Sequence, residues 1–247
     1  AAQGLVAGIN AYNYLNGSEM LELSRSSSYI GTLIDDLVTK DIQDPYRMLT
    51  SRSEYRLLLR QDNADVRLSP IGKKIGLIDD SQFKVFTDKQ EAIEREMNRI
   101  KNAKISATDE VNSVLSKVGQ SIDRGIKIVE LLKRPDIDYN VIKELDEETK
   151  NLNIPFDVAE QVEILTKYDG YLKRQEQQVQ EAGKLERFKI PDDIDYSKIE
   201  HISSETKDKL SKIRPKTLGQ ASRIGGVKPA DISILMVLLE RHQVAKL

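Results

Sequence analysis

The sequence predicts an all-α protein. Apolar residues recur every three or four positions through most of the chain, and an alternating apolar and polar run that would suit a strand occurs at most at residues 66–68. Proline and glycine interrupt the helical pattern at a few points, so that it divides into separate helices. With 247 residues, the chain is long enough for one large or two ordinary domains with a substantial core.

The composition excludes several classes of site. The formal net charge is −2 with 32% charged residues, so any attraction to nucleic acid has to come from a local cluster. There is no cysteine, and the two histidines, His201 and His242, are far apart in the sequence without a carboxylate pattern beside them. We therefore predict no metal site, no disulfide and no catalytic residue within this chain.

Residues 1–11 have small and apolar side chains at helical spacing and do not begin with Met. This pattern predicts a helix entered partway along, and hence a fragment or a processed product. The longest nearly apolar run, residues 234–239, is far shorter than the ~20 residues that span a bilayer. We accordingly expect a soluble, cytoplasmic protein that does not contact a membrane.

The middle of the chain predicts several amphipathic helices. Residues 87–104 begin with a possible capping box, Thr87 with Gln90, and residues 121–133 and 138–147 repeat the helical pattern. These stretches belong to a predicted helical domain, residues 79–190, between an N-terminal segment, 1–78, and a small C-terminal helical subdomain, 191–247.

The longest helical pattern covers residues 157–186, where Gln175 places a polar group in an otherwise apolar stripe. Such a stripe either packs inside a helix bundle, which is the simpler interpretation, or offers a face to a partner. Residues 188–202 then combine Pro191 with several aspartates and break the periodicity, so we predict a linker there. Three shorter helices follow, at residues 204–213, 217–224 and 230–239.

The stretch "MLTSRSEYRLLLRQDNADVRLS", residues 48–69, sets arginines around three consecutive leucines. A capping box of Ser51 with Glu54 predicts a helix over residues 52–61, with the leucines on the core. The turn that follows, residues 62–65, would fix the directions of the neighbouring arginines. In such a helix, Arg52, Arg56 and Arg60 would lie on one face, because they are spaced four residues apart.

Residues 46–76 carry seven basic and three acidic side chains, a local charge of +4 in a chain of net −2. Such a cluster, with Tyr46 and Tyr55 available for stacking, is typical of a surface that contacts phosphates and exposed bases. Alternatively, the cations form a purely structural network with Glu54, Asp62 and Asp65. The candidate phosphate-binding residues are Arg47, Arg52, Arg56, Arg60, Arg67, Lys73 and Lys74.

The C-terminal stretch predicts two helices joined by a turn with Gly225, Gly226 and Pro229. The turn resembles helix-hairpin-helix elements, whose backbone N–H groups can contact phosphates, although a plain packing hairpin is the simpler interpretation. The last helix is apolar almost all round, so its side chains are either buried in the core or dock on a partner. The candidate partner-binding residues are Ile232, Leu235, Met236 and Leu239.

Three stretches carry a likeness to one family. Residues 1–11, "AAQGLVAGINA", residues 29–68, "YIGTLIDDLVTKDIQDPYRMLTSRSEYRLLLRQDNADVRL", and residues 212–239, "KIRPKTLGQASRIGGVKPADISILMVLL", resemble segments of the MnmG (GidA) family. The likeness extends over essentially the whole chain. Members of this family are FAD-dependent enzymes that modify the wobble uridine of certain transfer RNAs.

The resemblance implies a two-part enzyme system. The family's protein binds FAD, is reduced by NADH, and works as a homodimer with the GTPase MnmE to install an aminomethyl or carboxymethylaminomethyl group on C5 of the uridine. The glycine fingerprint of its FAD-binding Rossmann-like domain and its catalytic cysteines lie in the N-terminal portion. This chain has no G-x-G-x-x-G and no cysteine. We therefore expect a C-terminal helical region that lacks that domain and, by itself, is inactive and without cofactor.

The resemblance also implies roles within this chain. Gln3 and Gly4 would be a remnant of the flavin domain at its end, whereas the helical remainder would bind tRNA and dock MnmE. A competing interpretation is a stand-alone helical protein-interaction module that does not bind nucleic acid.

Overall fold

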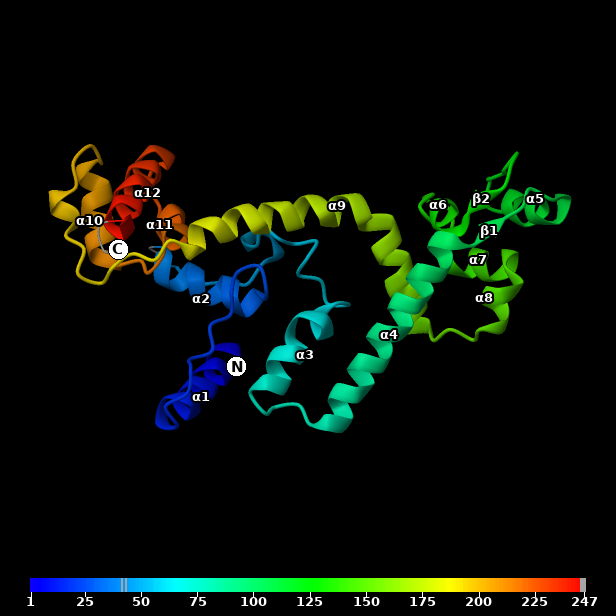
Figure 1. Cartoon of the computed structure of the whole chain (residues 1–247), viewed down its shortest axis with the longest axis horizontal. Helices are drawn as coiled ribbons and strands as arrows, with labels where there is room; N and C mark the ends of the chain where they lie inside the picture. The colour runs from blue at the N-terminus through cyan, green and yellow to red at the C-terminus, as the bar shows by residue number, and fades with distance from the viewer. Residues whose placement is uncertain (41, 43, 245–247) are drawn as a thin grey trace. The chain divides into compact units, whose positions relative to one another are not determined.

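The computed structural model describes residues 1–40, 42 and 44–244, with side chains as far as residue 240. The regular structure in these residues is helical apart from one two-stranded pairing, which confirms the predicted all-α class (Figure 1). None of the described helices combines the length and apolar character that crossing a membrane requires.

The chain forms two compact units. The first unit consists of residues 1–60 together with 174–247, and the second consists of residues 61–173. The long helix α9, Phe156–Arg187, supplies residues to both, and its presence confirms the helix predicted over residues 157–186. The three segments predicted from the sequence, divided at residues 78 and 190, stay a prediction.

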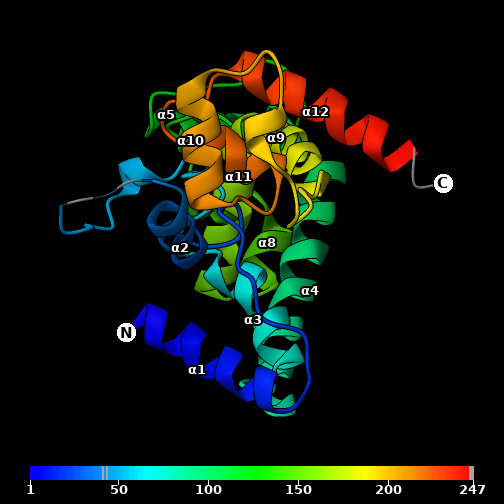
Figure 2. The ribbon, with the colours of Figure 1, turned by 90° about the vertical axis from the view of Figure 1, so that its left-hand side faces the viewer.

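The first unit begins with helix α1, Ala2–Leu15, helix α2, Tyr29–Thr39, and a short 3-10 helix, Thr50–Arg52. Its C-terminal part contains a second 3-10 helix, Tyr196–Lys198, and the helices α10, Ser204–Ile213, α11, Leu218–Arg223, and α12, Pro229–Val244. These three helices confirm the three predicted at the end of the chain, and Figure 2 shows them grouped together. The side chains at their centre are fully buried: Leu210, Leu218, Ala221 and Leu235.

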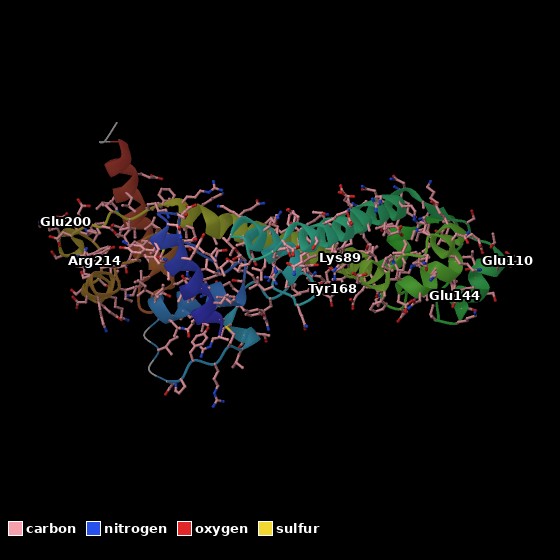
Figure 3. The ribbon with its side chains drawn as sticks, turned by 90° about the horizontal axis from the view of Figure 1, so that it is seen from below. Lys89, Glu110, Glu144, Tyr168, Glu200 and Arg214 are labelled. Atoms are coloured by element: carbon pink, nitrogen blue, oxygen red, sulfur yellow. The ribbon has the colours of Figure 1, made fainter. Side chains whose placement is uncertain are left out.

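Among the described residues, the second unit is built from six helices and two strands besides the first part of α9. Its helices are α3, Ala64–Lys74, α4, Asp80–Asn102, α5, Asp109–Ser116, α6, Ile128–Leu132, α7, Tyr139–Leu145, and α8, Glu147–Asn151. Strands β1, Lys104–Ile105, and β2, Ile126–Lys127, pair antiparallel, with Ile105 opposite Ile126. Charged residues such as Glu110 on α5 and Glu144 on α7 lie on its exposed surface (Figure 3). The core side chains include Ile100, Leu115, Ile128, Leu131, Ile142 and Val162.

A glycine allows the chain to cross the start of α2. Ser28 caps this helix by accepting a hydrogen bond from Gly31 N at 2.9 Å. A Cβ atom added at Gly31 would lie 2.2 Å from the carbonyl oxygen of Ser24 and 2.4 Å from that of Leu23. Only glycine therefore permits residues 23–24 to pass so close to α2, and this passage sets Arg25 beside the helix.

Two predictions in the arginine-rich stretch are wrong. The helix predicted over residues 52–61 is absent, because the 3-10 helix ends at Arg52 and residues 53–60 form extended backbone and turns. Its capping glutamate, Glu54, is bonded to Arg25 instead. The possible strand at residues 66–68 lies inside helix α3.

Other boundaries also differ from the predictions. Helix α4 starts with a capping box of Asp79 with Gln82, eight residues before the predicted one, so Thr87 lies inside the helix. The helix predicted at 121–133 shortens to α6, because residues 126–127 pair as β2. The predicted linker, residues 188–202, is packed against the core and contributes the buried side chains of Ile190, Tyr196, Ile199 and Ile202.

Candidate nucleic-acid interface

The seven predicted phosphate-binding residues are divided between the two units. The first unit contains Arg47, Arg52, Arg56 and Arg60, and the second contains Arg67, Lys73 and Lys74. The structure therefore does not place all seven on one defined surface, and each set has to be judged by its own contacts.

Three arginines of the first unit are exposed: Arg47, Arg52 and Arg56. Within the described residues, none of the three forms an ion pair with a carboxylate. The guanidinium carbon of Arg52 lies 5.1 Å from the centre of the Tyr46 ring, a cation–π contact that leaves its N–H donors available. We call Arg47, Arg52 and Arg56 the arginine surface.

The other four cations make local contacts or lie in the second unit. The half-buried Arg60 donates from Nη1 to the carbonyl oxygen of Leu57 at 2.5 Å. Arg67 donates to Asn63 Oδ1 at 3.1 Å, and Lys73 pairs with Asp80. Lys74 is exposed in the last turn of α3.

The backbone of the arginine surface is fixed by alternating burial. Ser53, Tyr55 and Leu59 are buried, whereas the side chains of residues 52 and 56 point outward. From α9, the Gln175 side chain donates to the carbonyl oxygen of Glu54 at 3.0 Å and accepts from Leu58 N at 3.1 Å. The polar residue that interrupts the apolar stripe of α9 thus holds both ends of the turn that carries Arg56.

Arg25 lies at the centre of a network beneath this segment and is only 7% exposed. Its Nε and Nη2 atoms donate to the two carboxylate oxygens of Glu54, both at 2.8 Å, and Nη2 also donates to the carbonyl oxygen of Arg52 at 3.2 Å. Nη1 donates to Asp36 at 2.6 Å and to Asp35 at 3.0 Å. One guanidinium therefore joins α2 to the backbone of the arginine surface.

Asp36 extends the network to the aromatic ring beneath Arg52. Its carboxylate is fully buried and accepts from Lys40 Nζ at 2.7 Å and from the Tyr46 hydroxyl at 2.8 Å. The Tyr46 ring is thereby fixed where Arg52 covers it.

Asp35 connects the network to the end of the chain. Besides Arg25, it accepts two hydrogen bonds from Arg223 of α11, at 2.8 and 2.7 Å. Arg223 also donates to Glu186 of α9 at 2.6 Å. The carboxylate of Asp35 therefore lies between two arginines that are far apart in the sequence.

The pKa shifts of Arg25 and Asp36 both favour the charged form of the side chain. Burial alone would lower the pKa of Arg25, but its hydrogen bonds to Glu54 and Asp36 outweigh burial and raise that pKa. Burial alone would raise the pKa of Asp36, but the hydrogen bonds from Lys40, Arg25 and Tyr46 lower it. Burial and the bond to Asp36 raise the pKa of Tyr46 to about 12, so its hydroxyl remains a donor.

The structural alternative for the basic cluster is not supported for the arginine surface. Glu54 pairs with Arg25, and Asp65 pairs with Lys89 of the second unit at 3.0 Å (Figure 3 shows Lys89). Asp62 accepts from Gln161 Nε2 at 3.0 Å. Tyr55, however, is only 9% exposed, so the prediction that it stacks on bases is wrong.

The second unit has its own arginine network. Arg99 of α4 donates two hydrogen bonds to Glu96, both at 2.8 Å, and one to Asp146 at 2.8 Å. Glu96 is 4% exposed and also accepts from the Tyr139 hydroxyl at 2.6 Å. Beside it lies a cavity of about 360 Å³ lined by Ala92, Arg95, Glu96, Arg99, Glu148, Leu152, Ile154, Pro155 and Val158.

The C-terminal helices cover most of the predicted partner-binding side chains. Ile232, Leu235 and Leu239 are buried in the core of the first unit, and Met236 packs against the same core. Their apolar surface is therefore already in contact within the chain. On α12 the exposed large apolar side chain is that of Val237, 48% exposed, within the described residues.

The two residues predicted to belong to the flavin site are not enclosed by other described parts of the chain. Gln3 and Gly4 are exposed in the first turn of α1, and a Cβ atom added at Gly4 would meet nothing within 4 Å. For the side chains that the structure describes, there is no group of three or more His, Asp or Glu that could hold a metal ion. The side chain of His242 lies outside them.

Sequence reasoning missed the residues that hold the interface in place: Arg25, Asp35, Asp36, Gln175 and Arg223. One signal was present, because adjacent aspartates within the apolar helix sequence "TLIDDLVT" need cationic partners once the helix is buried. The identity of those partners depends on contacts between distant parts of the chain, which no local pattern gives.

Two family models match the chain. The model of the C-terminal helical domain of the tRNA modifying enzyme MnmG/GidA matches residues 80–176, and the model of the C-terminal helical bundle of MnmG/GidA matches residues 178–246. The arginine surface lies before both ranges.

Individual proteins match over nearly the full chain. The tRNA uridine 5-carboxymethylaminomethyl modification enzyme MnmG of Caldicellulosiruptor saccharolyticus is 53% identical over 242 residues, 98% of this chain and 38% of that protein. The enzyme of the same name from Bacillus subtilis is 49% identical over 248 residues, 100% of this chain and 39% of its own length. The structure of Aquifex aeolicus GidA in its form II crystal matches with a TM-score of 0.80 and 39% identity, over 97% of this chain and 37% of that one. This chain thus spans about 38% of the length of the curated relatives.

Proposed function

Because this chain belongs to the MnmG/GidA family of tRNA-modifying enzymes, we propose that it is the C-terminal helical region of an enzyme that modifies C5 of the wobble uridine. In this proposal the region binds tRNA and docks the GTPase MnmE. The complete enzyme is a cytoplasmic homodimer that uses FAD and NADH, and its chemistry belongs to the portion outside this chain. Alone, the region is inactive.

The observation that carries tRNA binding is the contrast between two kinds of arginine in the first unit. Arg25 and Arg223 are largely buried and bonded to carboxylates, whereas the arginine surface is exposed without such partners among the described residues. A fixed backbone that presents unpaired guanidinium groups suits a polyanion, because each group can bind two phosphate oxygens. Phosphate contacts also supply much of the affinity for nucleic acid.

Docking of MnmE is assigned to the outward side of the C-terminal helices. The buried side of α12 is already covered within the unit, so a partner would meet Val237 and the polar residues around it. Deleting residues 191–247 would remove the core of the first unit as well, so substitution at Val237 is the sharper test. Val237→Glu should reduce co-purification with MnmE and leave the melting temperature unchanged, whereas unchanged co-purification would contradict docking there.

The test of tRNA binding uses the full-length protein with Arg47, Arg52 and Arg56 changed to Gln. Binding should weaken roughly equally for all tRNA sequences, and the dependence of log affinity on log salt should fall by about 0.7–0.9 per lost phosphate contact. A matched control removes three exposed cations of the second unit, Lys84, Lys117 and Lys133. Equal losses in both variants would mean that only net charge matters. Undiminished binding by the arginine variant would reject the proposal.

A further inference from the structure

We propose that Asp35 and Arg25 are positioning residues for the arginine surface, and that Arg223 ties their arrangement to the C-terminal helices. This inference rests on the proposed function, since it assigns a means of control to the same tRNA-binding site. It goes further because none of the three residues needs to touch RNA.

The first step is the contact between Arg25 and the segment that carries Arg52 and Arg56. Arg25 donates directly to the carbonyl oxygen of Arg52 and forms a two-point bond with Glu54, two residues further along. Residues 53–55 have no helix or strand to fix them within the described backbone. The direction in which Arg52 and Arg56 leave the surface therefore depends on this guanidinium and on Gln175, in addition to the buried side chains between the two arginines.

The second step is the sharing of Asp35. Arg25 and Arg223 both donate to it, so the position of the Arg25 guanidinium is set in part by an arginine of α11. Asp36 does not depend on Arg25 alone for its hydrogen bonds, because Lys40 Nζ and the Tyr46 hydroxyl also donate to its carboxylate. Asp35 is thus the link between Arg25 and the C-terminal helices.

The third step concerns why such a link would exist. Buried ion pairs contribute little net stability compared with apolar packing, because desolvation opposes the attraction between the charges. A network that fixes geometry is therefore better explained by the position it imposes than by the stability it adds. Here the network fixes the backbone beneath exposed arginines that, among the described residues, have no carboxylate partner.

The sign of the effect separates positioning from net charge. Changing Asp35 to Asn removes a negative charge, and charge alone would tighten binding of a polyanion. Positioning predicts the opposite, a loss of about three- to tenfold in tRNA affinity. Asp192, an exposed residue of the first unit that pairs with Lys216, provides the matched control, and Asp192→Asn should not weaken binding.

The decisive experiment is a double-mutant cycle in the full-length protein, with tRNA affinity measured at fixed salt and melting temperature recorded for every variant. The partners in the cycle are Asp35→Asn and the pair Arg52→Gln with Arg56→Gln. If Asp35 acts through these arginines, its substitution should change affinity by less than about twofold once they are gone. A merely structural role would give the same loss in both backgrounds and would overturn the inference.

A second variant covers the case in which Asp35→Asn does not fold. Arg223→Lys keeps the charge but cannot bond Asp35 at two points, so it should weaken binding in the same direction, again only when Arg52 and Arg56 are present. Wild-type affinity in this variant would overturn the inference. If the Arg52 and Arg56 variant itself binds tRNA normally, the proposed function fails as well, which distinguishes the two failures.

Discussion

The two units each contain a largely buried arginine that holds carboxylates at 2.6 to 3.0 Å, yet the two networks join different things. Arg99 links α4 to the start of α8, two elements whose backbones already have their own helical hydrogen bonds. Arg25 links α2 to a segment whose 3-10 helix ends at Arg52 and whose next residues form extended backbone and turns. A largely buried arginine thus reinforces regular secondary structure in the second unit. In the first unit, it fixes a segment that lacks regular secondary structure after Arg52.

The networks also differ in what remains when the arginine is lost. Without Arg99, the buried Glu96 retains the Tyr139 hydroxyl but has no other cationic partner among the described residues. Without Arg25, Asp36 retains Lys40 and Asp35 retains Arg223. We therefore expect the second unit to lose more free energy, and the first unit to lose order in one segment.

The largest effect is expected for Arg99→Met, which should lower the free energy of unfolding of the second unit by about 3–5 kcal/mol, because it leaves a buried carboxylate without a cation. Native-state hydrogen exchange of the α4 and α7 amides measures this loss. Arg95, one turn earlier on α4 and exposed, is the control, and Arg95→Met should stay within about 0.5 kcal/mol. An equal loss of unfolding free energy in both variants would show that Arg99 and Arg95 contribute equally to stability.

Arg25→Met should cost less than about 3 kcal/mol, since Asp36 keeps Lys40, Asp35 keeps Arg223, and the side chain of Glu54 is exposed to water. Its signature is local: amides of residues 50–59 should exchange faster, whereas those of α10 should keep their protection. Arg47→Met, a substitution at an exposed position of the same unit, should alter amide exchange neither in residues 50–59 nor in α10. Loss of protection throughout the unit would mean that Arg25 stabilises the core rather than the segment.

The smallest effect is expected for Gln175→Ala, which removes one donor and one acceptor from the backbone of the same segment. A cost of about 1–2 kcal/mol follows from two neutral hydrogen bonds. Gln178→Ala, at an exposed position of α9, is the control for helix propensity. An unchanged exchange rate at Leu58 in the Gln175 variant would show that the side chain does not hold the turn.

The fold class and the helices at residues 157–186 and 204–213 could be predicted because their apolar residues repeat at helical spacing over several turns. The conformation of residues 52–56 could not be predicted from spacing. Side chains four residues apart share a side in a helix and also in extended backbone, where the period is two. Arg52 and Arg56 are therefore both outward, as predicted, although the predicted helix is absent.

Within the candidate site, sequence indicated the exposed arginines but not the groups that hold them. The arginine surface could be recognised from local charge, because its residues lie within one short stretch. Arg25 and Arg223 look like any other surface cations until folding brings both to Asp35. Pairing over such distances depends on tertiary contacts, which the local spacing of residues in the sequence does not reveal.

The buried anchors at Ser53, Tyr55 and Leu59 have a consequence for the thermodynamics of association. A disordered arginine-rich tail would lose about 1–2 kcal/mol of backbone conformational entropy for each residue that a ligand orders. Here that ordering is completed when the protein folds, so a polyanion that meets Arg52 and Arg56 restricts only their side-chain rotamers. Such preorganised binding favours affinity from a small number of contacts.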